Sequence, residues 1–444
     1  MDPLSLATID SYQQAVEWLE QHYNLESVLG KPEIVAPSLD RMRVVMELLG
    51  HPEIAVPAIH ITGTNGKGST TRMIVEMLTA VGLKAGSYTS PHVTSLNDRI
   101  AIANQPLSDQ EFCEAIKEIA VIEPWILNKS DSLPNYFEII CAAAYNWFAM
   151  NAVDVNVMEV GMGGRWDATN VVSAEVAVIT NMGSDHLEII GPTMADLARE
   201  KSGIIEPTSH VVCGTLEHDL LQIVKSVPCR ELWIQDIDFA VTNDRLAVGG
   251  RMLDVSTPFG SYEEIFIPVN GRHQSNNALL AIAATEAFFA RALDADILHD
   301  AFASVQLPAR FEILSRSPLT IVDGAHNVDG AVALSETLFS DFEAEEAPVL
   351  VMGTNRPHNP IDFMKAVNFK EFKAIVATQA KWPRALEASE VASSAQKLGH
   401  RSVEFRADVA EAVDLAREIA GPQGSVVVTG SLYVASEARS HLQS

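Results

Sequence analysis

Cysteine is rare in this sequence. Only four of the 444 residues are cysteines, Cys113, Cys141, Cys213 and Cys229, and none belongs to a C-x-x-C motif. A chain of this length can bury a core without disulfide bonds. We therefore expect reduced thiols and a cytoplasmic location.

Positive charge is also scarce. Lysine and arginine total 31 against 58 aspartates and glutamates, which gives a formal net charge of −27. A surface of this sign repels the phosphates of nucleic acids and the head groups of anionic lipids, so we expect no nucleic-acid partner. An anionic substrate would need a local cluster of Lys, Arg and His that acts against the overall field.

Long apolar segments are missing as well. The sequence has no run of about 18 consecutive apolar residues, the length that a membrane-spanning helix needs. Its first residues, MDPLSLATIDSYQQ, contain neither the basic stretch nor the apolar stretch of a signal peptide. We therefore expect no membrane partner.

What the sequence does contain is an alternation of apolar runs and helical patterns, the rhythm of a parallel α/β sheet. The stretch 211–268 is less regular and predicts a small β-rich excursion. The other expected elements are helices at 11–21, 39–49, 70–81, 194–204 and 277–292, and strands at 59–61, 155–160 and 176–180.

A second βα series follows Pro308, where we place the domain boundary. The predicted fold class is α/β, with an N-terminal P-loop ATPase-like parallel-sheet domain (1–308) and a C-terminal Rossmann-like domain (309–444). The acidic run 341–346 is predicted to be a solvated loop. The expected strands of the second domain are 319–323, 349–352, 374–378, 402–405 and 425–429.

The strongest local signal is a glycine-rich turn between a short apolar strand and a helix, His60-Ile-Thr-Gly-Thr-Asn-Gly-Lys-Gly-Ser-Thr70. Backbone N–H groups, a helix N-terminus and the charge of Lys67 together predict a polyphosphate cradle. The turn departs from the common G-x-x-x-x-G-K-[ST] pattern, because Ile61 replaces the first glycine and Gly68 separates Lys67 from Ser69. It is therefore not the loop of an ordinary P-loop ATPase.

Two more polar residues follow strands that should end at the same sheet edge. Glu159 ends an apolar strand, and an acidic residue beside a phosphate loop is the usual ligand for Mg²⁺. His186 follows the next strand, within Asn181-Met-Gly-Ser-Asp-His-Leu187. A lone histidine is more often structural, and Lys201 by itself is typical of a surface lysine.

One short match indicates a different functional class. Asn128-Lys-Ser-Asp131 fits the N-K-x-D element by which GTPases recognise guanine, which would make the protein a nucleotide switch. Against this, the four residues lie in an expected polar loop before Pro134 and do not follow a proper strand. Four-residue matches also arise by chance in long chains.

Taken together, the motifs resemble the folylpolyglutamate synthase and dihydrofolate synthase family, within the Mur ligase group of ATP-dependent amide-forming ligases. A cell-wall Mur ligase would carry an extra domain before the phosphate loop, whereas only 62 residues precede Gly63 here. The motifs that recur in the family's order are Gly63 to Ser69, Thr89 to His92 with Asn97 to Ile100, Tyr136 to Glu138, Glu159 to Asn170, Asp185-His186, Glu200 to Ile204, His273-Gln274 with Asn277-Ala278, Pro308 to Glu312, Asp323 to Asn327 and Gly430 to Tyr433.

The resemblance implies a phosphate site and two Mg²⁺ sites, with Lys67, Lys201 and His186 as catalytic residues. Ser90 and Glu159 would hold one Mg²⁺, and His186 would hold the second together with Lys201, which family members often carry as a carbamate. The residues implied around the ATP phosphates are Gly63, Thr64, Asn65, Gly66, Lys67, Gly68 and Ser69.

Further roles are implied for both domains. Asn277, Arg310 and Asp323 would contact the nucleotide, and His326 and Ser431 would line the cleft for the incoming amino acid. The implied reaction is phosphoryl transfer from ATP to a carboxylate of dihydropteroate or a reduced folate, followed by attack of L-glutamate on the acyl phosphate. A monomer is expected, and another Mur-type amino-acid ligase is the alternative.

The sequence departs from the family pattern at several positions. Ser202, Trp166 and Ala309 replace the more usual Ala, Leu and Gly, changes that we interpret as packing changes. Where relatives usually carry an Asp-Lys-Asp loop, this chain has Gly353-Thr-Asn-Arg-Pro-His-Asn359. Arg356 and His358 are candidates to compensate in glutamate recognition.

Overall fold

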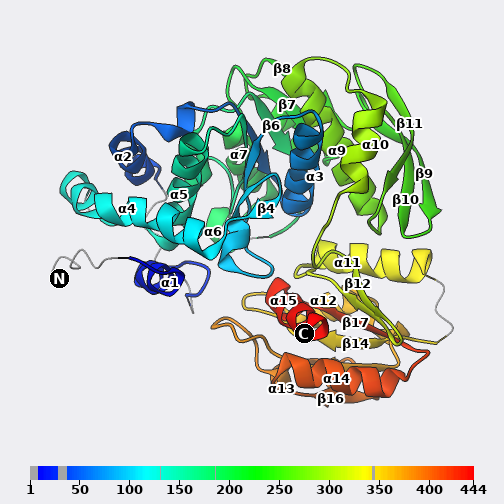
Figure 1. Cartoon of the computed structure of the whole chain (residues 1–444). Coiled ribbons are helices and arrows are strands. Elements are labelled where there is room, and N and C mark those ends of the chain that lie inside the picture. Colours follow the sequence, from blue (N-terminus) through cyan, green and yellow to red (C-terminus); the bar gives the residue numbers. More distant parts are fainter. Residues whose placement is uncertain (1–8, 29–37, 131, 186, 343–345) are drawn as a thin grey trace.

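The larger domain is built on an eight-stranded sheet in the order β4-β3-β2-β5-β1-β6-β7-β8 (Figure 1). The computed structural model describes residues 9–28, 38–130, 132–185, 187–342 and 346–444. The central strand β1 (Ala58–Thr62) pairs in parallel with β5 (Val155–Glu159) on one side and β6 (Val176–Ile179) on the other. All five residues of β1 are buried, as expected for a parallel strand covered on both faces.

The remaining strands extend the sheet on both sides of these three. On one side β2 joins in parallel, and a hairpin of β3 and β4 closes the edge with antiparallel pairs. On the other side β7 and β8 continue the parallel order. Their bounds are β2 (Ala85–Tyr88), β3 (Ile100–Ile102), β4 (Gln105–Pro106), β7 (His210–Cys213) and β8 (Glu231–Ile234).

Helices cover both faces, and the buried apolar side chains form two large clusters and one smaller cluster. On one face α3 and α9 pack with α10 and the small sheet described below. On the other face α5 packs with α4 and the first two helices. Their bounds are α1 (Tyr12–Glu20), α2 (Asp40–Leu49), α3 (Lys67–Ala80), α4 (Asp109–Lys129), α5 (Tyr136–Met150), α9 (Arg272–Phe289) and α10 (Ala295–Ala303).

Three sequence predictions are corrected in this domain. The excursion over 211–268 contains a helix, α8 (His218–Lys225), and strands of the main sheet; only its second half forms a separate antiparallel sheet. The helix expected at 277–292 begins five residues earlier, directly after Gly271, and ends at Phe289. Asn128 lies in the last turn of α4, not in a loop, and Asp131 lies outside the described residues. The strands of the small sheet are β9 (Ala240–Ala247), β10 (Gly250–Ser256) and β11 (Ser261–Ile267).

The second domain carries a six-stranded sheet in the order β12-β13-β17-β14-β15-β16. All its pairs are parallel except β12–β13. Helices α11 to α13 cover one face, while α14 and α15 cover the other. The bounds are β12 (Glu312–Arg316), β13 (Leu319–Val322), α11 (Val328–Glu336), β14 (Val349–Met352), α12 (Pro360–Ala366), β15 (Ala374–Ala377), α13 (Ala388–Lys397), β16 (Val403–Phe405), α14 (Val409–Ala420), β17 (Ser425–Thr429) and α15 (Leu432–Gln443).

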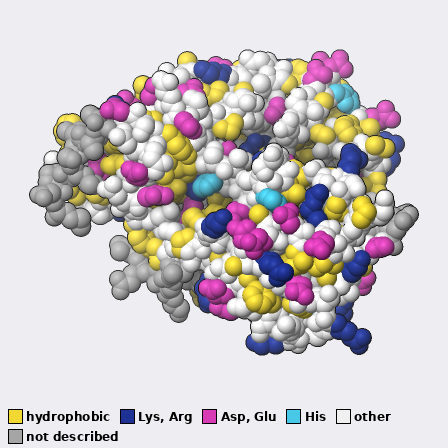
Figure 2. All heavy atoms as spheres, turned by 60° about the horizontal axis from the view of Figure 1, so that its bottom comes forward, with side chains coloured by type: hydrophobic (Ala, Val, Ile, Leu, Met, Phe, Trp, Pro, Cys, Tyr) yellow, Lys and Arg dark blue, Asp and Glu magenta, His cyan; other side chains and the backbone are white. Residues whose placement is uncertain are grey.

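On the face drawn in Figure 2, acidic and basic side chains are interspersed. The expectation of a solvated loop at 341–346 is wrong for Asp341, which ends a helical turn and whose side chain is 9% exposed and paired with Arg251 of β10. Within the described ranges, every helix is too short or too polar to cross a bilayer. The exact boundary at Pro308 stays a prediction.

A buried ion pair fastens the segment after α1 to the loop between β2 and β3. The Nη1 and Nη2 atoms of Arg99 donate to the two carboxylate oxygens of Glu26 at 2.8 and 2.6 Å, and the Arg99 side chain is fully buried. Burial alone would raise the pKa of Glu26, but the attraction of Arg99 outweighs it and leaves this pKa below its ordinary value. The pair therefore stabilises the fold when Glu26 is ionised.

We expect Glu26→Gln to lower the free energy of unfolding by about 3 to 5 kcal/mol, because the charge of Arg99 would stay buried without its partner. In the unaltered chain, this contribution is complete above the ordinary carboxyl pKa of 4.5 and disappears as the pH falls through the lower folded value. Urea unfolding across this pH range measures it. Asp10→Asn, which removes the exposed pair with Lys117, is the control and should change little; equal losses would contradict the expectation.

Candidate active site

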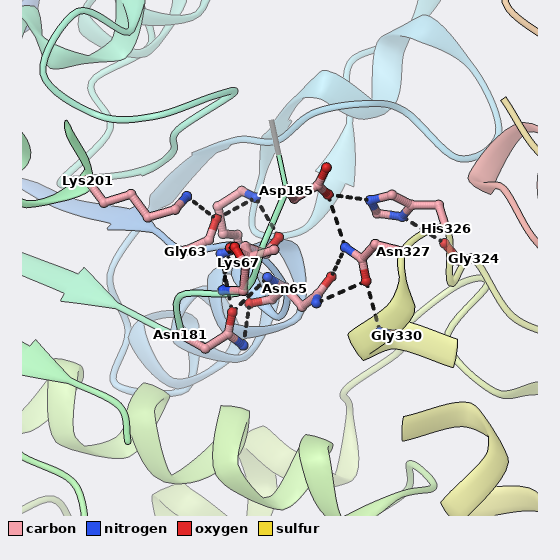
Figure 3. Close-up of polar contacts among 12 residues, drawn as sticks. Gly63, Asn65, Lys67, Asn181, Asp185, Lys201, Gly324, His326, Asn327 and Gly330 are labelled. Carbon is pink, nitrogen blue, oxygen red and sulfur yellow. Dashed lines mark hydrogen bonds and ion pairs between the residues drawn. The ribbon is translucent and has the colours of Figure 1, made fainter. Parts of the chain in front are cut away.

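The ends of β1 and β6 meet at one edge of the large sheet and hold the glycine-rich turn between them (Figure 3). The backbone N–H groups of Thr64 and Asn65 both donate to Oδ1 of Asn181, at 3.2 and 2.9 Å. In the opposite direction, Oγ1 of Thr180 and Nδ2 of Asn181 donate to the carbonyl of Asn65 at 2.6 and 3.2 Å. The turn is therefore fixed by the residues that follow the neighbouring strand.

Two glycines of this turn have no room for a side chain. Gly63 and Gly66 have φ values of 151° and 84°, in the region that disfavours L side chains. A Cβ atom on Gly63 would lie 1.8 Å from Oγ1 of Thr180, and one on Gly66 would lie 2.3 Å from Oδ1 of Asn277. This contact brings Asn277, an expected nucleotide ligand on α9, directly against the turn.

Two lysine ammonium groups converge on the turn. Nζ of Lys67 donates to the carbonyls of Gly63 and Thr64 at 3.1 and 3.3 Å, and Nζ of Lys201 donates to the carbonyl of Gly63 at 2.8 Å. Lys201 is only 5% exposed, so its interpretation as a surface lysine is wrong. Burial, reinforced by repulsion from Lys67, lowers the pKa of Lys201 to about 7.

Glu159 lies near Lys67 at the end of β5. Its carboxyl group is buried, and this burial raises its pKa to about 7 although the charge of Lys67 acts in the opposite direction. The backbone N–H of Ser90 donates to Oε2 of Glu159 at 3.3 Å, and a Cβ on Gly68 would lie 3.3 Å from the same oxygen. The structure thus brings together the two residues expected to hold one Mg²⁺.

The second domain covers this edge with the loop before α11 (Figure 3). The amides of Asn327 and Asn65 form a reciprocal pair, with Nδ2 of Asn327 3.0 Å from Oδ1 of Asn65. Nδ2 of Asn327 also donates to Oδ2 of Asp185 at 3.1 Å. Nε2 of His326 lies 3.6 Å from the same oxygen, so the expected amino-acid ligand His326 lies near the phosphate loop.

The two other expected nucleotide ligands come from the linker and the strand end that follows it. Both carboxylate oxygens of Asp323 accept backbone N–H groups, from Phe311 and Ala325, at 2.8 Å each. Nη1 of Arg310 donates to the carbonyl of Ala309 at 3.1 Å. Ala309 has a φ of 54°, so its replacement of the family's glycine is a matter of backbone conformation and not of packing alone.

Ser431 and His186 are the remaining expected site residues. Ser431 is buried, and its hydroxyl accepts the N–H of Val434 at 3.1 Å as the N-cap of α15. His186 lies outside the described residues. Among the residues that are described, no three His, Cys, Asp or Glu side chains form a group that could hold a metal.

The loop that replaces Asp-Lys-Asp has two different environments. Nη2 of Arg356 lies 3.2 Å from a carboxylate oxygen of Glu390, in an exposed pair on the second domain. The ring of His358 lies 5.7 Å from the ring of His326. Of the two candidates for glutamate recognition, only His358 is therefore close to the site residues.

Comparison with known proteins identifies the family. Residues 61–285 match the Mur ligase middle domain, and residues 309–432 match the glutamate ligase domain of Mur ligases. The chain belongs to the Mur ligase family. Among its curated relatives, the dihydrofolate synthase/folylpolyglutamate synthase of Mycobacterium tuberculosis is 35% identical, over 91% of this chain and 90% of the relative.

Solved structures agree with this assignment. The Mycobacterium tuberculosis folylpolyglutamate synthase complexed with ADP and AMPPCP is 34% identical, with a TM-score of 0.90 over 98% of this chain and 99% of that one. A folylpolyglutamate synthase complexed with AMPPCP and folate is 28% identical, with a TM-score of 0.80 over 98% and 100%. The family, the fold class and the enzyme class, an ATP-dependent ligase, are confirmed.

Three residues of this Mur ligase site had no role predicted from the sequence. They are Thr180, which contributes its hydroxyl, and Asn181 and Asn327, which contribute their amides. Each lies in a polar segment directly after a strand or before a helix. Their hydrogen bonds join segments that are separated by 115 to 262 positions in the chain. Position after a strand was the signal available for Thr180 and Asn181, and Asn327 could have been recognised as the N-cap of α11.

We expect Gly66→Ala to destabilise the protein more than Gly82→Ala. Both glycines have left-handed backbones, with φ values of 84° and 94°, so either alanine should cost about 1 kcal/mol in backbone strain. Only at Gly66 does the new Cβ meet a buried side chain, whereas nothing lies within 4 Å at Gly82. Chemical denaturation of the two variants measures the difference, and equal losses would show that Asn277 yields freely.

Proposed function

We propose that the chain joins L-glutamate to dihydropteroate and also extends reduced folates, in each case through an acyl phosphate made with ATP. The proposal is carried by the meeting of Lys67, Lys201 and Glu159 at the phosphate loop. An anionic carboxylate and an anionic γ-phosphate approach each other only where their charge is offset. The names and the bound ligands of the relatives support this choice of substrates.

In this scheme the phosphate loop and Lys67 bind the phosphates of ATP. Backbone N–H groups at the start of α3 and the ammonium of Lys67 supply positive potential to the transferring group. Asn277, Arg310 and Asp323 bind the rest of the nucleotide. The contact between Asn327 and Asn65 brings the second domain over the loop, which limits the access of water to the acyl phosphate.

Glu159 and Ser90 fit a Mg²⁺ site. A buried carboxylate whose pKa is raised to about 7 is costly to ionise, and a divalent cation with oxygen ligands would offset that cost. Bound there, Mg²⁺ would neutralise the phosphates and favour their transfer. We propose Lys201 and His186 for a second Mg²⁺.

Lys201 also fits the proposed carbamate. An amine reacts with CO₂ only in its neutral form, and a pKa of about 7 makes much of Lys201 neutral at physiological pH. The product is an anionic oxygen ligand beside Lys67, which replaces repulsion between two cations by attraction. A monomeric state and a cytoplasmic location remain predictions from the sequence.

We expect Lys67→Ala to abolish ATP-dependent turnover with little change in the melting temperature. The side chain contributes two hydrogen bonds to its own loop, and its loss removes the repulsion on Lys201. ADP release and thermal unfolding measure the two effects. Lys129→Ala on the surface of α4 is the control and should behave as the unaltered chain; activity retained in Lys67→Ala would contradict the assignment.

Lys201→Ala should lose activity that acetate or another small carboxylate partly restores, because the carboxylate replaces the carbamate oxygens. The unaltered chain should also lose activity in buffer depleted of CO₂ and regain it on addition of bicarbonate. Initial rates of ADP release measure both effects. Arg199→Ala, two positions earlier on the same helix, should show neither response, and a fully active Lys201→Ala would remove this lysine from the site.

The choice of acceptor is tested by ADP release with Mg-ATP and L-glutamate, in parallel with dihydropteroate and with a reduced folate. We expect turnover with both acceptors and none in glutamate-free controls. Turnover with one acceptor alone would restrict the activity to a dihydrofolate synthase or to a polyglutamylase. If neither acceptor supports ADP release, the loop 353–359 serves another acceptor or amino acid, as in the alternative of a different Mur-type ligase.

A further inference from the structure

A buried ion pair joins the small antiparallel sheet of the first domain to the second domain. Arg251 of β10 has a side chain that is 2% exposed. Its Nε donates to Oδ1 of Asp244 in the neighbouring strand at 2.7 Å, and its Nη1 donates to Oδ2 of Asp341 in the second domain at 2.6 Å. One guanidinium thus bridges an intradomain and an interdomain carboxylate.

The interdomain carboxylate connects in turn to the linker that carries Arg310 and to Asp323 at the end of β13. The residue after Asp341 is Phe342, whose ring lies 4.9 Å from the ring of Phe311. The backbone N–H of Phe311 donates to Oδ2 of Asp323 at 2.8 Å. These two contacts therefore lead from the segment of Asp341 to the two expected nucleotide ligands, Arg310 and Asp323.

A half-buried histidine, His273, lies between these groups. Burial lowers the pKa of His273, the second residue of α9. A Cβ on the preceding Gly271 would lie 2.5 Å from both the ring of His273 and Oγ1 of Thr337, so the two domains are in close contact here. The charged groups that act on the His273 ring are Asp323, Arg310, Arg251 and Asp341.

The linker around Arg310 has a strained backbone conformation. Ala309 and Phe311, which flank Arg310, have φ values of 54° and 48°. Left-handed conformations of residues with a side chain persist only where the surrounding structure holds them. The ring of Phe342 contacts Phe311, which is one of the two strained residues. The hydrogen bond from Arg251 to Asp341 holds the residue directly before Phe342.

We propose that Arg251 and Asp341 form a positioning pair for nucleotide binding: they hold the second domain so that Arg310 and Asp323 reach the nucleotide. Neither residue of the pair touches the nucleotide in this scheme. The inference rests on the proposed ATP site, and it goes beyond that site by naming a contact of the small sheet that sets nucleotide affinity.

Arg251 donates to two carboxylates, those of Asp244 and Asp341, and this allows a matched test. Asp341→Asn removes the interdomain charge and leaves Arg251 paired with Asp244 inside its own sheet. The buried guanidinium therefore keeps one carboxylate partner. Asp244→Asn removes the other charge from the same guanidinium and leaves the interdomain contact in place. The two variants therefore differ in which side of the bridge they weaken.

Binding of AMPPCP by titration calorimetry and steady-state ADP release are measured on both variants and on the unaltered chain. We expect Asp341→Asn to weaken AMPPCP binding by about tenfold, within the usual range of coupling between sites. The KM for ATP should rise with it, whereas the KM for the acceptor should not. Asp244→Asn should bind AMPPCP as the unaltered chain does. The backbone N–H of Phe311 should exchange faster with solvent in Asp341→Asn alone.

Three outcomes would overturn the inference. Equal AMPPCP affinity in Asp341→Asn and the unaltered chain would show that the pair does not position the nucleotide ligands. Equal weakening in both variants would show a general loss of stability. Absence of AMPPCP binding by the unaltered chain would overturn the proposed ATP site and this inference with it, which separates the two failures.

If Asp341→Asn does not fold, Asp341→Glu gives the same decision. This variant keeps the charge but lengthens the side chain by one methylene, so it should displace the second domain without leaving Arg251 unpaired. We expect an AMPPCP affinity below that of the unaltered chain. Unchanged affinity would again contradict the positioning role.

Discussion

Two ammonium groups share one backbone carbonyl at the centre of the molecule, and the rest of the site follows from this arrangement. Lys67 and Lys201 both donate to the carbonyl of Gly63, within 3.1 and 2.8 Å. They come from different helices, so the contact requires β1 and β6 to end at the same edge with α3 and α7 (Met194–Lys201) above it. Two ammonium groups this close repel each other, and loss of the proton from Lys201, whose pKa is lowered to about 7, relieves that repulsion.

The second domain completes this site through contacts that lie far apart. Near the phosphate loop, Asn327 pairs with Asn65. At the other side, Nη1 of Arg439 on α15 donates to Oγ1 of Thr94 at 3.1 Å. Together with the bridge at Arg251 these contacts fix an orientation, because three separated points determine how one rigid body lies on another. The orientation of the second domain is therefore set by polar contacts at separate places along the interface.

The sequence was sufficient for the elements whose signal is local. Buried parallel strands such as β1 and β5 are short apolar runs, and their order along the chain predicts the sheet edge. Lys201 was misjudged although Leu197, four residues earlier, is buried on the same helical face, a spacing that indicated burial. Asp341 could not be predicted, because its partner lies 90 positions away and acidic neighbours surround it.

The excess of negative charge and the basic site act over different distances, which reconciles a formal charge of −27 with an anionic substrate. Surface charges are screened beyond about 8 Å at physiological ionic strength. Charges inside the site, such as the half-buried ammonium group of Lys67, are screened less, so their attraction acts once an anion has entered. The acidic surface therefore affects how fast phosphates and carboxylates arrive, whereas Lys67 and the backbone N–H groups of the phosphate loop decide how firmly phosphates are held.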